Sequence, residues 1–181
     1  PNLKKKIKTF SEYESKLILK KNKIPIPKSL VTNKKNILRD SKKIGFPLVA
    51  KINSNKVFHK TEIGGVITNI NSEKELKKIT NKFTGNILIE KMITDNVFEM
   101  IIGIKNDNEF GPTIILGAGG IYTELFKDTT TLLLPLTKRI ILEEIKKLKF
   151  SKILFGFRGK NSGDLDALVS SILKIAKFAE N

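Results

Sequence analysis

The segment from Lys51 to Val66 carries the residues best suited to chemistry, and it contains the only histidine of the chain. Phosphoryl transfer depends on fixed positive charge and on backbone N–H groups directed at phosphates. Lys51 ends an expected buried strand, where an ammonium group is costly unless an anion accompanies it. Gly64 and Gly65 have no Cβ, so the backbone can come close to a ligand there. The segment therefore predicts contact with the phosphates of ATP, against the alternative of a plain loop with two turn glycines.

His59 is the side chain of this segment whose ordinary pKa lies near neutrality. A neutral imidazole can attack a γ-phosphate and carry the phosphoryl group as phosphohistidine, whereas a lone surface histidine is usually inert. A single histidine excludes a metal site with several histidine ligands, and the absence of cysteine excludes thiolate ligands. The sequence also lacks the Walker motif GxxxxGK[ST] and the GxSxG motif.

Two acidic residues and one arginine are further candidates. Glu90 is expected at the end of an apolar strand and Glu99 inside the next strand. Each carboxylate could accept a hydrogen bond from a ribose or an adenine amino group, and the alternative is two exposed strand positions. Arg158 lies in the segment Gly156 to Gly159. Its planar fork of donors suits an anion, although an arginine in a glycine-rich turn is often a plain surface residue.

The composition is that of a globular protein with surplus lysine. The 181 residues are 40% hydrophobic and 29% charged, with a formal charge of +16, and no apolar run is long enough to span a bilayer. The lysines are spread along the chain without interleaved aromatic residues, which argues against a specific nucleic-acid partner. No cysteine and no apolar leader at the start predict a reducing cytoplasm and no membrane.

The hydrophobic pattern predicts an α+β fold with no internal repeat. Capping boxes at Ser11 and Ser72 start helices, the first over 12–21. A helix over 34–44 and a helix from Asp164 follow apolar periodicity, as does one that starts near Thr137. Extended segments are expected over 26–31, 46–53, 66–70, 87–92, 98–105, 111–116, 122–126 and 129–134. We expect two lobes, 1–90 and 91–181.

Six segments, in this order along the chain, resemble the ATP-grasp β subunit of ADP-forming acetyl-CoA synthetases. The resemblance runs from Glu14 to Ala179, and HKTxxGGV at 59–66 followed by FGP and GxGG is its most specific part. The segments are IPIP at 24–27, IGFPLVAK at 44–51, HKTEIGGV at 59–66, FGP at 110–112, GAGGIYTE at 117–124 with Lys127-Asp128, and GFRG at 156–159.

The resemblance implies an ATP-grasp fold of two mixed α/β lobes that enclose a nucleotide site. His59 would be the relay histidine that passes a phosphoryl group between ATP or ADP and a partner. Lys51, Gly64 and Gly65 would lie at the nucleotide phosphates. The adenine hinge would comprise Glu90, Lys91 and Met92, with Glu99 at the ribose and Arg158 at an anion.

The same resemblance implies a CoA-binding α subunit as partner in an α2β2 assembly, with Mg²⁺ as the accompanying ion. Two departures bear on this expectation. Leu132 stands where the family usually has an arginine, and the sequence ends at Asn181, before the stretch that supplies the family's Mg²⁺ ligands. No metal ligand is therefore assigned. The resemblance thus leads us to expect a chain that is truncated, split from a second polypeptide, or degenerate.

Two functions follow as expectations. The first is the nucleotide-binding subunit of an acid–CoA ligase (ADP-forming). The second is a non-catalytic or regulatory ATP-grasp module, as in a fused protein acetyltransferase. Labelling of His59 by ATP separates them, because only the first requires a phosphohistidine.

Overall fold

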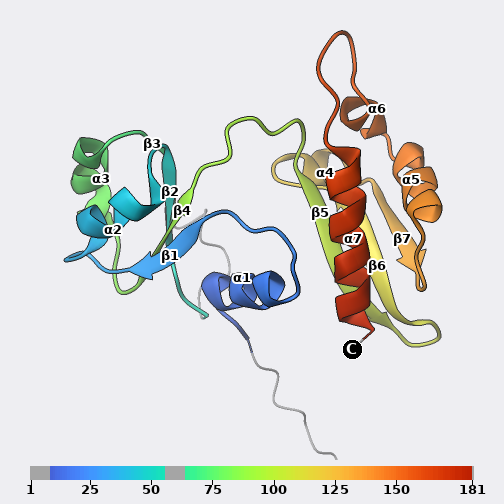
Figure 1. Cartoon of the computed structure of the whole chain (residues 1–181), viewed down its shortest axis with the longest axis horizontal. Coiled ribbons are helices and arrows are strands. Elements are labelled where there is room, and N and C mark those ends of the chain that lie inside the picture. The colour runs from blue at the N-terminus through green and yellow to red at the C-terminus, as the bar shows by residue number, and fades with distance from the viewer. Residues whose placement is uncertain (1–8, 56–63, 181) are drawn as a thin grey trace, which may run out of the picture. The chain divides into compact units, whose positions relative to one another are not determined.

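The computed structural model describes residues 9–55 and 64–180, and His59 lies outside them. The chain divides into two compact units, each with its own sheet (Figure 1). Unit 1 comprises Pro1–Lys21 and Pro25–Thr94, and unit 2 comprises Asn22–Ile24 and Asp95–Asn181. The mixture of helices and antiparallel strands in both units confirms the α+β class.

Unit 1 is built on a four-stranded antiparallel sheet. Its strands lie in the order β1 (Ser29–Thr32), β4 (Ile87–Lys91), β2 (Leu48–Ile52) and β3 (Val66–Ile70). The central strands are rich in Ile, Leu and Val, the residue types that fit a buried pleated surface. Strands β2 and β4 are central, so each pairs with a neighbouring strand on both sides. This pairing fixes the backbone that carries the side chains at their ends.

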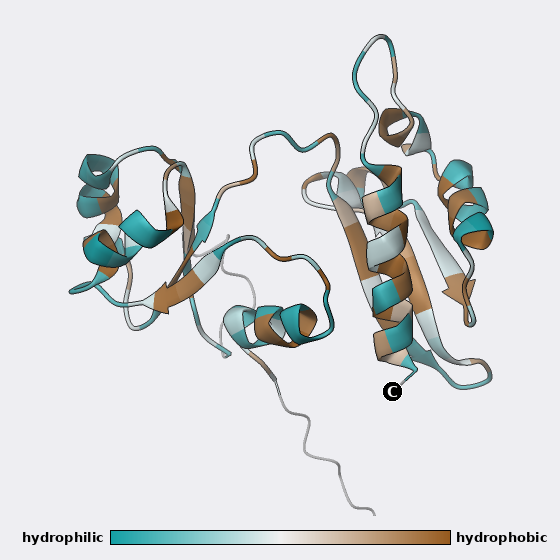
Figure 2. Ribbon diagram, viewed as in Figure 1, coloured by the Kyte–Doolittle hydropathy of each residue, from teal (hydrophilic) through white to brown (hydrophobic). Residues whose placement is uncertain are grey.

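Two helices cover one face of this sheet, α2 (Ile37–Ile44) and α3 (Glu73–Ile79), the latter followed by the 3-10 turn η1 (Thr80–Lys82). Ser72 caps α3 by accepting the N–H of Glu75, as the capping box predicts. Figure 2 shows that the outer surfaces of α2 and α3 are mainly hydrophilic. The apolar core beneath them consists of Ile37, Ile44, Leu48, Ala50, Ile70, Leu76, Phe83, Ile87 and Ile89.

Helix α1 (Glu12–Lys21) lies at the other face of the unit 1 sheet, as its contact with Glu90 shows, because Glu90 alternates with the core residue Ile89. Its predicted capping box forms: Ser11 Oγ accepts the N–H of Glu14, and Glu14 Oε2 accepts the N–H of Ser11 at 2.7 Å. The N–H of Tyr13 donates to the Asn53 side chain. The start of α1 is thus tied to the residue that follows β2.

Unit 2 is built on a three-stranded antiparallel sheet in the order β5 (Met100–Asp107), β6 (Gly111–Ala118) and β7 (Thr129–Leu133). The predicted hairpin joins β5 to β6, and Asp107 Oδ1 accepts the N–H groups of Glu109 and Phe110 in its turn. Glu99 was expected inside a strand, but β5 begins at Met100, so Glu99 sits just before it.

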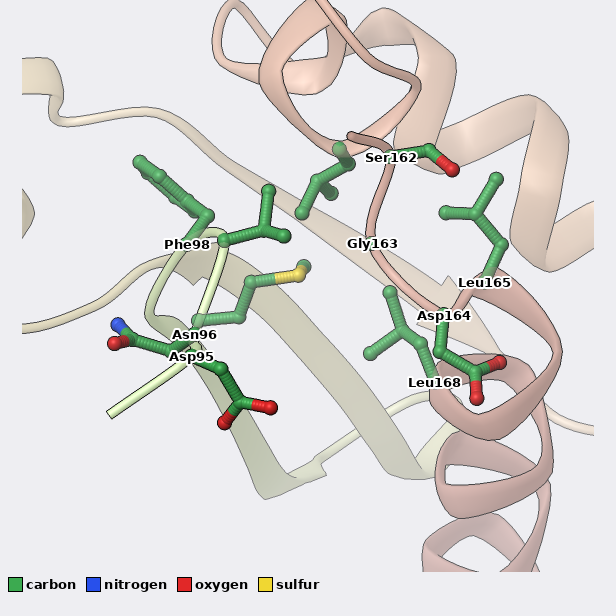
Figure 3. A pocket seen from close by; sticks show the side chains of 11 residues that line it. Asp95, Asn96, Phe98, Ser162, Gly163, Asp164, Leu165 and Leu168 are labelled. Atoms are coloured by element: carbon green, nitrogen blue, oxygen red, sulfur yellow. The ribbon is translucent and has the colours of Figure 1, made fainter. Parts of the chain in front are cut away.

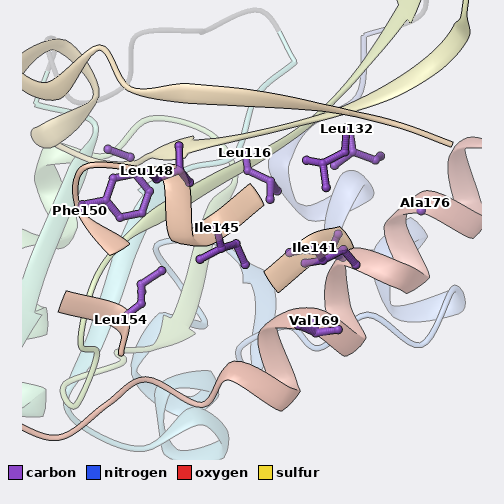
Figure 4. Close-up of a cluster of buried hydrophobic side chains, with 12 residues drawn as sticks. Leu116, Leu132, Ile141, Ile145, Leu148, Phe150, Leu154, Val169 and Ala176 are labelled. Atoms are coloured by element: carbon purple, nitrogen blue, oxygen red, sulfur yellow. The ribbon is translucent and has the colours of Figure 1, made fainter. Parts of the chain in front are cut away.

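Helices α5 (Lys138–Lys147) and α7 (Leu165–Ala179) pack on one face of this sheet, and the short α6 (Ser151–Leu154) joins the same core. Thr137 and Asp164 cap α5 and α7 through their side chains. Figure 4 shows the buried side chains that meet between sheet and helices. They are Ile114, Leu116, Ala118, Leu132, Ile141, Ile145, Leu148, Phe150, Leu154, Val169, Ile172 and Ala176.

The extended conformation predicted for 122–126 is wrong, because this segment is the helix α4 (Tyr122–Phe126). The N–H of Tyr122 donates to Gly119 O, and Thr123 Oγ1 donates to Ala118 O, so the glycine cluster folds back and starts the turn. Lys127, with a left-handed φ of 44°, ends it. A single turn is too short for apolar periodicity to reveal. Within the described residues, no helix has the length and apolarity needed to cross a membrane.

Candidate functional site

Lys51 lies in β2 with its ammonium group against the carboxylate of Glu90 in β4. The Nζ to Oε1 distance is 2.5 Å. The two residues are diagonal neighbours on one face, since Glu90 is opposite Val49 and Lys51 is opposite Leu88. Glu90 is 5% exposed, so the anionic partner that the position of Lys51 requires is a buried carboxylate.

Helix α1 adds two further charges to this pair. Glu12 Oε1 lies 2.7 Å from Lys51 Nζ, and Lys16 Nζ lies 3.1 Å from Glu12 Oε1. Lys16 also contacts Oε2 of Glu90. We call these four residues the charge ring, because each lysine touches both glutamates and the formal charges cancel.

The charge ring shifts the pKa values of two of its members. Burial opposes the ionisation of Glu12, but hydrogen bonds and charge from Lys51 and Lys16 outweigh burial and lower its pKa from 4.5 to about 2. Burial likewise disfavours the charged form of Lys51, yet the hydrogen bonds to Glu12 and Glu90 raise its pKa above 10.5. Both groups are therefore ionised at neutral pH.

Gly64 and Gly65 differ in their surroundings. Gly64 is exposed, with φ of 66° and open space where a Cβ would stand. Gly65 is buried, and its carbonyl accepts the N–H of Ile52 at 2.8 Å. Gly64 thus has the freedom for a ligand to approach, whereas Gly65 continues the pairing of β2 with β3. The prediction for His59 falls outside the described residues.

The expected hinge residues Lys91 and Met92 are held by neighbouring backbone. Lys91 Nζ donates to Phe46 O, and the N–H of Met92 donates to Pro47 O at 3.1 Å. The sulfur of Met92 accepts the N–H of Asn69. The N–H of Met92 is therefore already committed within unit 1.

Glu99 and Arg158 line a pocket within unit 2. The pocket has a volume of about 1010 Å³ and is lined by Asn96, Val97, Phe98, Glu99, Gly120, Ile121, Tyr122, Phe126, Ile153, Phe157, Arg158, Lys160 and Asn161. Arg158 is exposed, has a left-handed φ of 49°, and lies 5.2 Å from the ring of Phe157. One carboxylate, two cations and several aromatic rings thus share one pocket.

The glycine cluster forms the wall beside Glu99. The N–H of Gly119 donates to the Glu99 carbonyl at 2.8 Å. A Cβ on Gly120, whose φ is 56°, would stand 2.3 Å from Glu99 Oε2. Phe98 stacks on Phe150 at 4.6 Å and on Tyr122 at 5.5 Å between ring centroids. The side chain of Glu99 therefore occupies space that only glycine leaves open.

A second pocket of unit 2, about 370 Å³ in volume, contains none of the predicted site residues (Figure 3). Met100, Leu154, Leu165 and Leu168 supply apolar lining, and the carboxylates of Asp95 and Asp164 stand at opposite sides. Asp164 Oδ1 already accepts the N–H of Ala167 as the cap of α7. The two pockets share Asn96, Val97 and Phe98, whereas Gly120 and Arg158 line only the larger one.

The described residues contain no cluster of three or more potential metal ligands. Among residues 9–55 and 64–180, no three His, Cys, Asp or Glu residues gather as they would around a metal ion. The carboxylate of Asp128, which follows the glycine cluster, accepts the N–H of Lys149.

Leu132, where the resemblance leads one to expect arginine, is 2% exposed in the apolar core of unit 2. The side chain at that position therefore packs within the core of unit 2.

The structure thus gathers the predicted residues into two groups, one per unit. Lys51 and Glu90 meet in unit 1, and Glu99 and Arg158 share the pocket in unit 2. Glu12 and Lys16 were missed by the sequence reasoning. Their spacing of four residues on a predicted helix, together with the need of Lys51 for an anion, is the signal that was available.

Comparison with known proteins identifies the fold. A family model described as ATP-grasp domain matches residues 2–181. The β subunit of acetate–CoA ligase [ADP-forming] II from Pyrococcus furiosus is 33% identical over 94% of this chain and 77% of its own length. The acetate–CoA ligase [ADP-forming] of Methanocaldococcus jannaschii is 33% identical over 98% of this chain.

Among solved structures, acetyl-coenzyme A synthetase 1 of Ca. Korarchaeum cryptofilum has a TM-score of 0.84 and 34% identity, covering 94% of this chain and 79% of that one. It was solved with coenzyme A and Mg-AMPPCP, its phosphohistidine segment pointing towards the nucleotide binding site. The present chain spans only 27% of the M. jannaschii protein. It belongs to the ATP-grasp family, among relatives that include the β subunits of ADP-forming acetate–CoA ligases.

Proposed function

We propose that this chain is the nucleotide-binding subunit of an ADP-forming acyl-CoA synthetase. The reaction is acyl-CoA + ADP + phosphate = acid + ATP + CoA, and the chain transfers the phosphoryl group between ATP or ADP and a histidine relay. The observation that carries the proposal is the position of the Lys51 ammonium, which the charge ring holds in place. Lys51 stands in β2, the strand that precedes the segment with His59 along the chain. Similarity to the β subunits of Pyrococcus furiosus supports the reaction class.

Lys51 neutralises nucleotide phosphates in this proposal. Its pKa lies above the ordinary value, so the ammonium is fully charged at neutral pH. A partly buried cation acts on phosphates more strongly than one in open water, because the surroundings screen it less. Gly64 adds an open backbone position, and Gly65 fixes the start of β3 beside it.

His59 is the proposed nucleophile. An imidazole nitrogen forms a bond to the γ-phosphorus of ATP, the bond from that phosphorus to the β-phosphate oxygen breaks, and ADP leaves with the bonding electron pair. The N–H proton on the other imidazole nitrogen is lost to water, which leaves a neutral ring carrying the phosphoryl group. In the direction of ATP synthesis the same bonds form and break in reverse.

The remaining predicted residues complete the nucleotide site. We assign the ribose to Glu99, an anion to Arg158, and the adenine to the surface formed by Glu90, Lys91 and Met92. The pocket of unit 2 supports the first two assignments, because it brings a carboxylate and a guanidinium together beside aromatic rings. Mg²⁺ would accompany the nucleotide and neutralise phosphate charge, and we assign no residue to it because no cluster of three potential ligands occurs among the described residues.

The partner in this proposal is a CoA-binding α subunit, in an α2β2 assembly. The relatives named as β subunits support a separate partner chain. The acyl group and most CoA contacts then belong to the partner, which is why no residue here is assigned to them.

Titration of ADP into the 181-residue chain by calorimetry tests nucleotide binding. We expect binding by the wild type and at least a tenfold weaker affinity for Lys51→Met. Lys138→Met removes an equal charge from an exposed ion pair of unit 2 and is the matched control, expected to bind as the wild type does. No binding by the wild type, or equal affinities for both variants, would refute the proposal.

Addition of the α subunit tests turnover. Acetyl-CoA, ADP and phosphate should then yield ATP, and His59→Ala should abolish the yield while it still binds ADP. Binding without ATP formation, even in the presence of the α subunit, would instead identify a regulatory nucleotide-binding module.

A further inference from the structure

Helix α1 places Glu12 against Lys51 and Lys16 against both glutamates of the charge ring, and no catalytic role above uses Glu12 or Lys16. Glu12 and Lys16 are four residues apart and therefore share one face of the helix. Both are largely shielded, with side-chain exposures of 27% and 14%. The bond from the N–H of Tyr13 to Asn53 fixes the first turn of α1 beside the end of β2. The position of these charges is thus built into unit 1.

The contacts form a closed cycle of alternating sign. Lys51 lies between Glu12 and Glu90, at 2.7 and 2.5 Å. Lys16 contacts the same two carboxylates, using the other oxygen of Glu90. An ammonium group has three N–H donors, and Lys51 already gives two of them to carboxylates. A nucleotide phosphate that contacts Lys51 must therefore share the ammonium with these carboxylates or displace one.

Glu12 is the carboxylate better suited to leave. Its side chain is 27% exposed, against 7% for Glu90, and it stands on a helix while Glu90 is fixed in a central strand. A carboxylate that stayed beside an incoming phosphate would repel it, because both are anions in a partly dehydrated place. Lys16 already touches Glu12, so the displaced carboxylate would still have a cation.

We propose that Glu12 is a placeholder for a nucleotide phosphate: it holds the ammonium of Lys51 in the free chain and yields it to the phosphate, while Lys16 retains the released carboxylate. The proposal rests on the proposed function, in which Lys51 contacts nucleotide phosphates. No covalent bond changes, and the charge ring stays neutral apart from the phosphate that it gains.

The placeholder role predicts opposite effects for the two residues of α1. Without the charge of Glu12, the phosphate has no competitor and no repelling neighbour, so affinity rises. Without the charge of Lys16, two carboxylates depend on Lys51 alone, so affinity falls. A purely structural role of α1 would lower affinity for both substitutions, because each would loosen the same helix.

Calorimetric titration with ADP tests the proposal on the 181-residue chain. We expect Glu12→Gln to lower the Kd roughly three- to tenfold and Lys16→Gln to raise it by a similar factor, with recovery in Lys16→Arg. The controls are Asp166→Asn, which removes a carboxylate charge from an ion pair of unit 2, and Lys20→Gln, which removes a charge from the exposed face of α1. Both should leave the Kd unchanged.

The outcomes separate the two proposals. An unchanged or raised Kd in Glu12→Gln, with normal binding by the wild type, overturns the placeholder role alone. Failure of the wild type to bind ADP overturns both. If Glu12→Gln does not fold, the Kd of Lys16→Gln for ADP tests the placeholder role instead. An unchanged or lowered Kd for Lys16→Gln would contradict the replacement of Glu12 by the phosphate. Reductive methylation of Lys51, followed by mass spectrometry, should also be faster in Glu12→Gln than in the wild type.

Discussion

Lys51 and Glu90 join neighbouring central strands through an ion pair of 2.5 Å between Nζ and Oε1. The pair is not isolated, because Glu12 and Lys16 close it into a ring from the side of α1. A buried charge is tolerated when a group of opposite charge lies beside it. Removal of one residue of the ring leaves the charge of its partner without that compensation. The ring therefore bears on the stability of unit 1 as well as on nucleotide binding.

Substitution of Lys51 by methionine should destabilise unit 1. Glu12 and Glu90 would then share Lys16 alone, and the free energy of unfolding should fall by about 2–4 kcal/mol. Urea unfolding followed by circular dichroism measures the change. Lys138→Met breaks the exposed pair with Asp166 and should cost less than about 1 kcal/mol. Equal losses in the two variants would contradict the assignment of the ring as a buried network.

Acid should weaken the charge ring within a defined pH range. The pKa of Glu12 in the folded chain is about 2, below its ordinary value of 4.5. A lowered pKa gives stability that is fully present above pH 4.5 and is lost as pH falls towards 2. The loss should be on the order of 1–2 kcal/mol, since solvent reaches part of the side chain. The raised pKa of Lys51 acts oppositely, with stability present below pH 10.5 and lost above it.

The free energy of unfolding of the wild type and of Glu12→Gln, measured between pH 2 and pH 7, isolates the contribution of this carboxylate. The difference between the two proteins should shrink as pH falls below 4.5. A difference that stays constant over this range would show that Glu12 is not held ionised by the ring.

Replacement of Gly120 by alanine should disturb the pocket of unit 2. The new Cβ would meet Glu99 Oε2 at 2.3 Å, so the carboxylate must turn away. We expect a several-fold loss of ADP affinity in addition to a backbone cost of about 1 kcal/mol. Gly111→Ala is the control in the same unit, because its φ is also left-handed and its Cβ would meet open space. It should show the backbone cost without the loss of affinity.

Arg158 should contribute to anion binding through its planar donors. Arg158→Ala is expected to raise the Kd for ADP about tenfold, and Arg158→Lys should recover part of the loss because it restores charge without the fork. Arg139→Ala removes an exposed arginine of α5 that pairs with Glu143 at 3.9 Å, and it should have no effect. Equal titration curves for Arg158→Ala and the wild type would remove Arg158 from the site.

Much of the fold could be predicted because its signals are local. Capping boxes and apolar periodicity place α1, and the side chain of Asp164 begins α7 as the pattern indicates. Helix α4 was missed because one turn, set by hydrogen bonds to the glycine cluster, leaves no periodic pattern. The start of β5 depends on pairing with β6, which residues near Glu99 do not encode by themselves.

The site could be predicted in part. The need of Lys51 for an anion is a local inference, and the structure supplies Glu90 from a strand far along the chain. The roles of Glu12 and Lys16 depend on how α1 packs against the sheet, which spacing alone does not give. At Leu132 the resemblance leads one to expect an arginine, and the leucine that stands there packs in the core of unit 2.

Labelling with ATP that carries a radioactive γ-phosphate tests the central claim most directly. The wild-type chain should acquire an acid-labile, alkali-stable phosphoryl group, and mass spectrometry should place it on His59. His59→Ala should remain unlabelled while it binds ADP with the affinity of the wild type. Equal labelling of His59→Ala and the wild type, or a wild type that binds ATP and acquires no label, would contradict phosphoryl relay through this histidine.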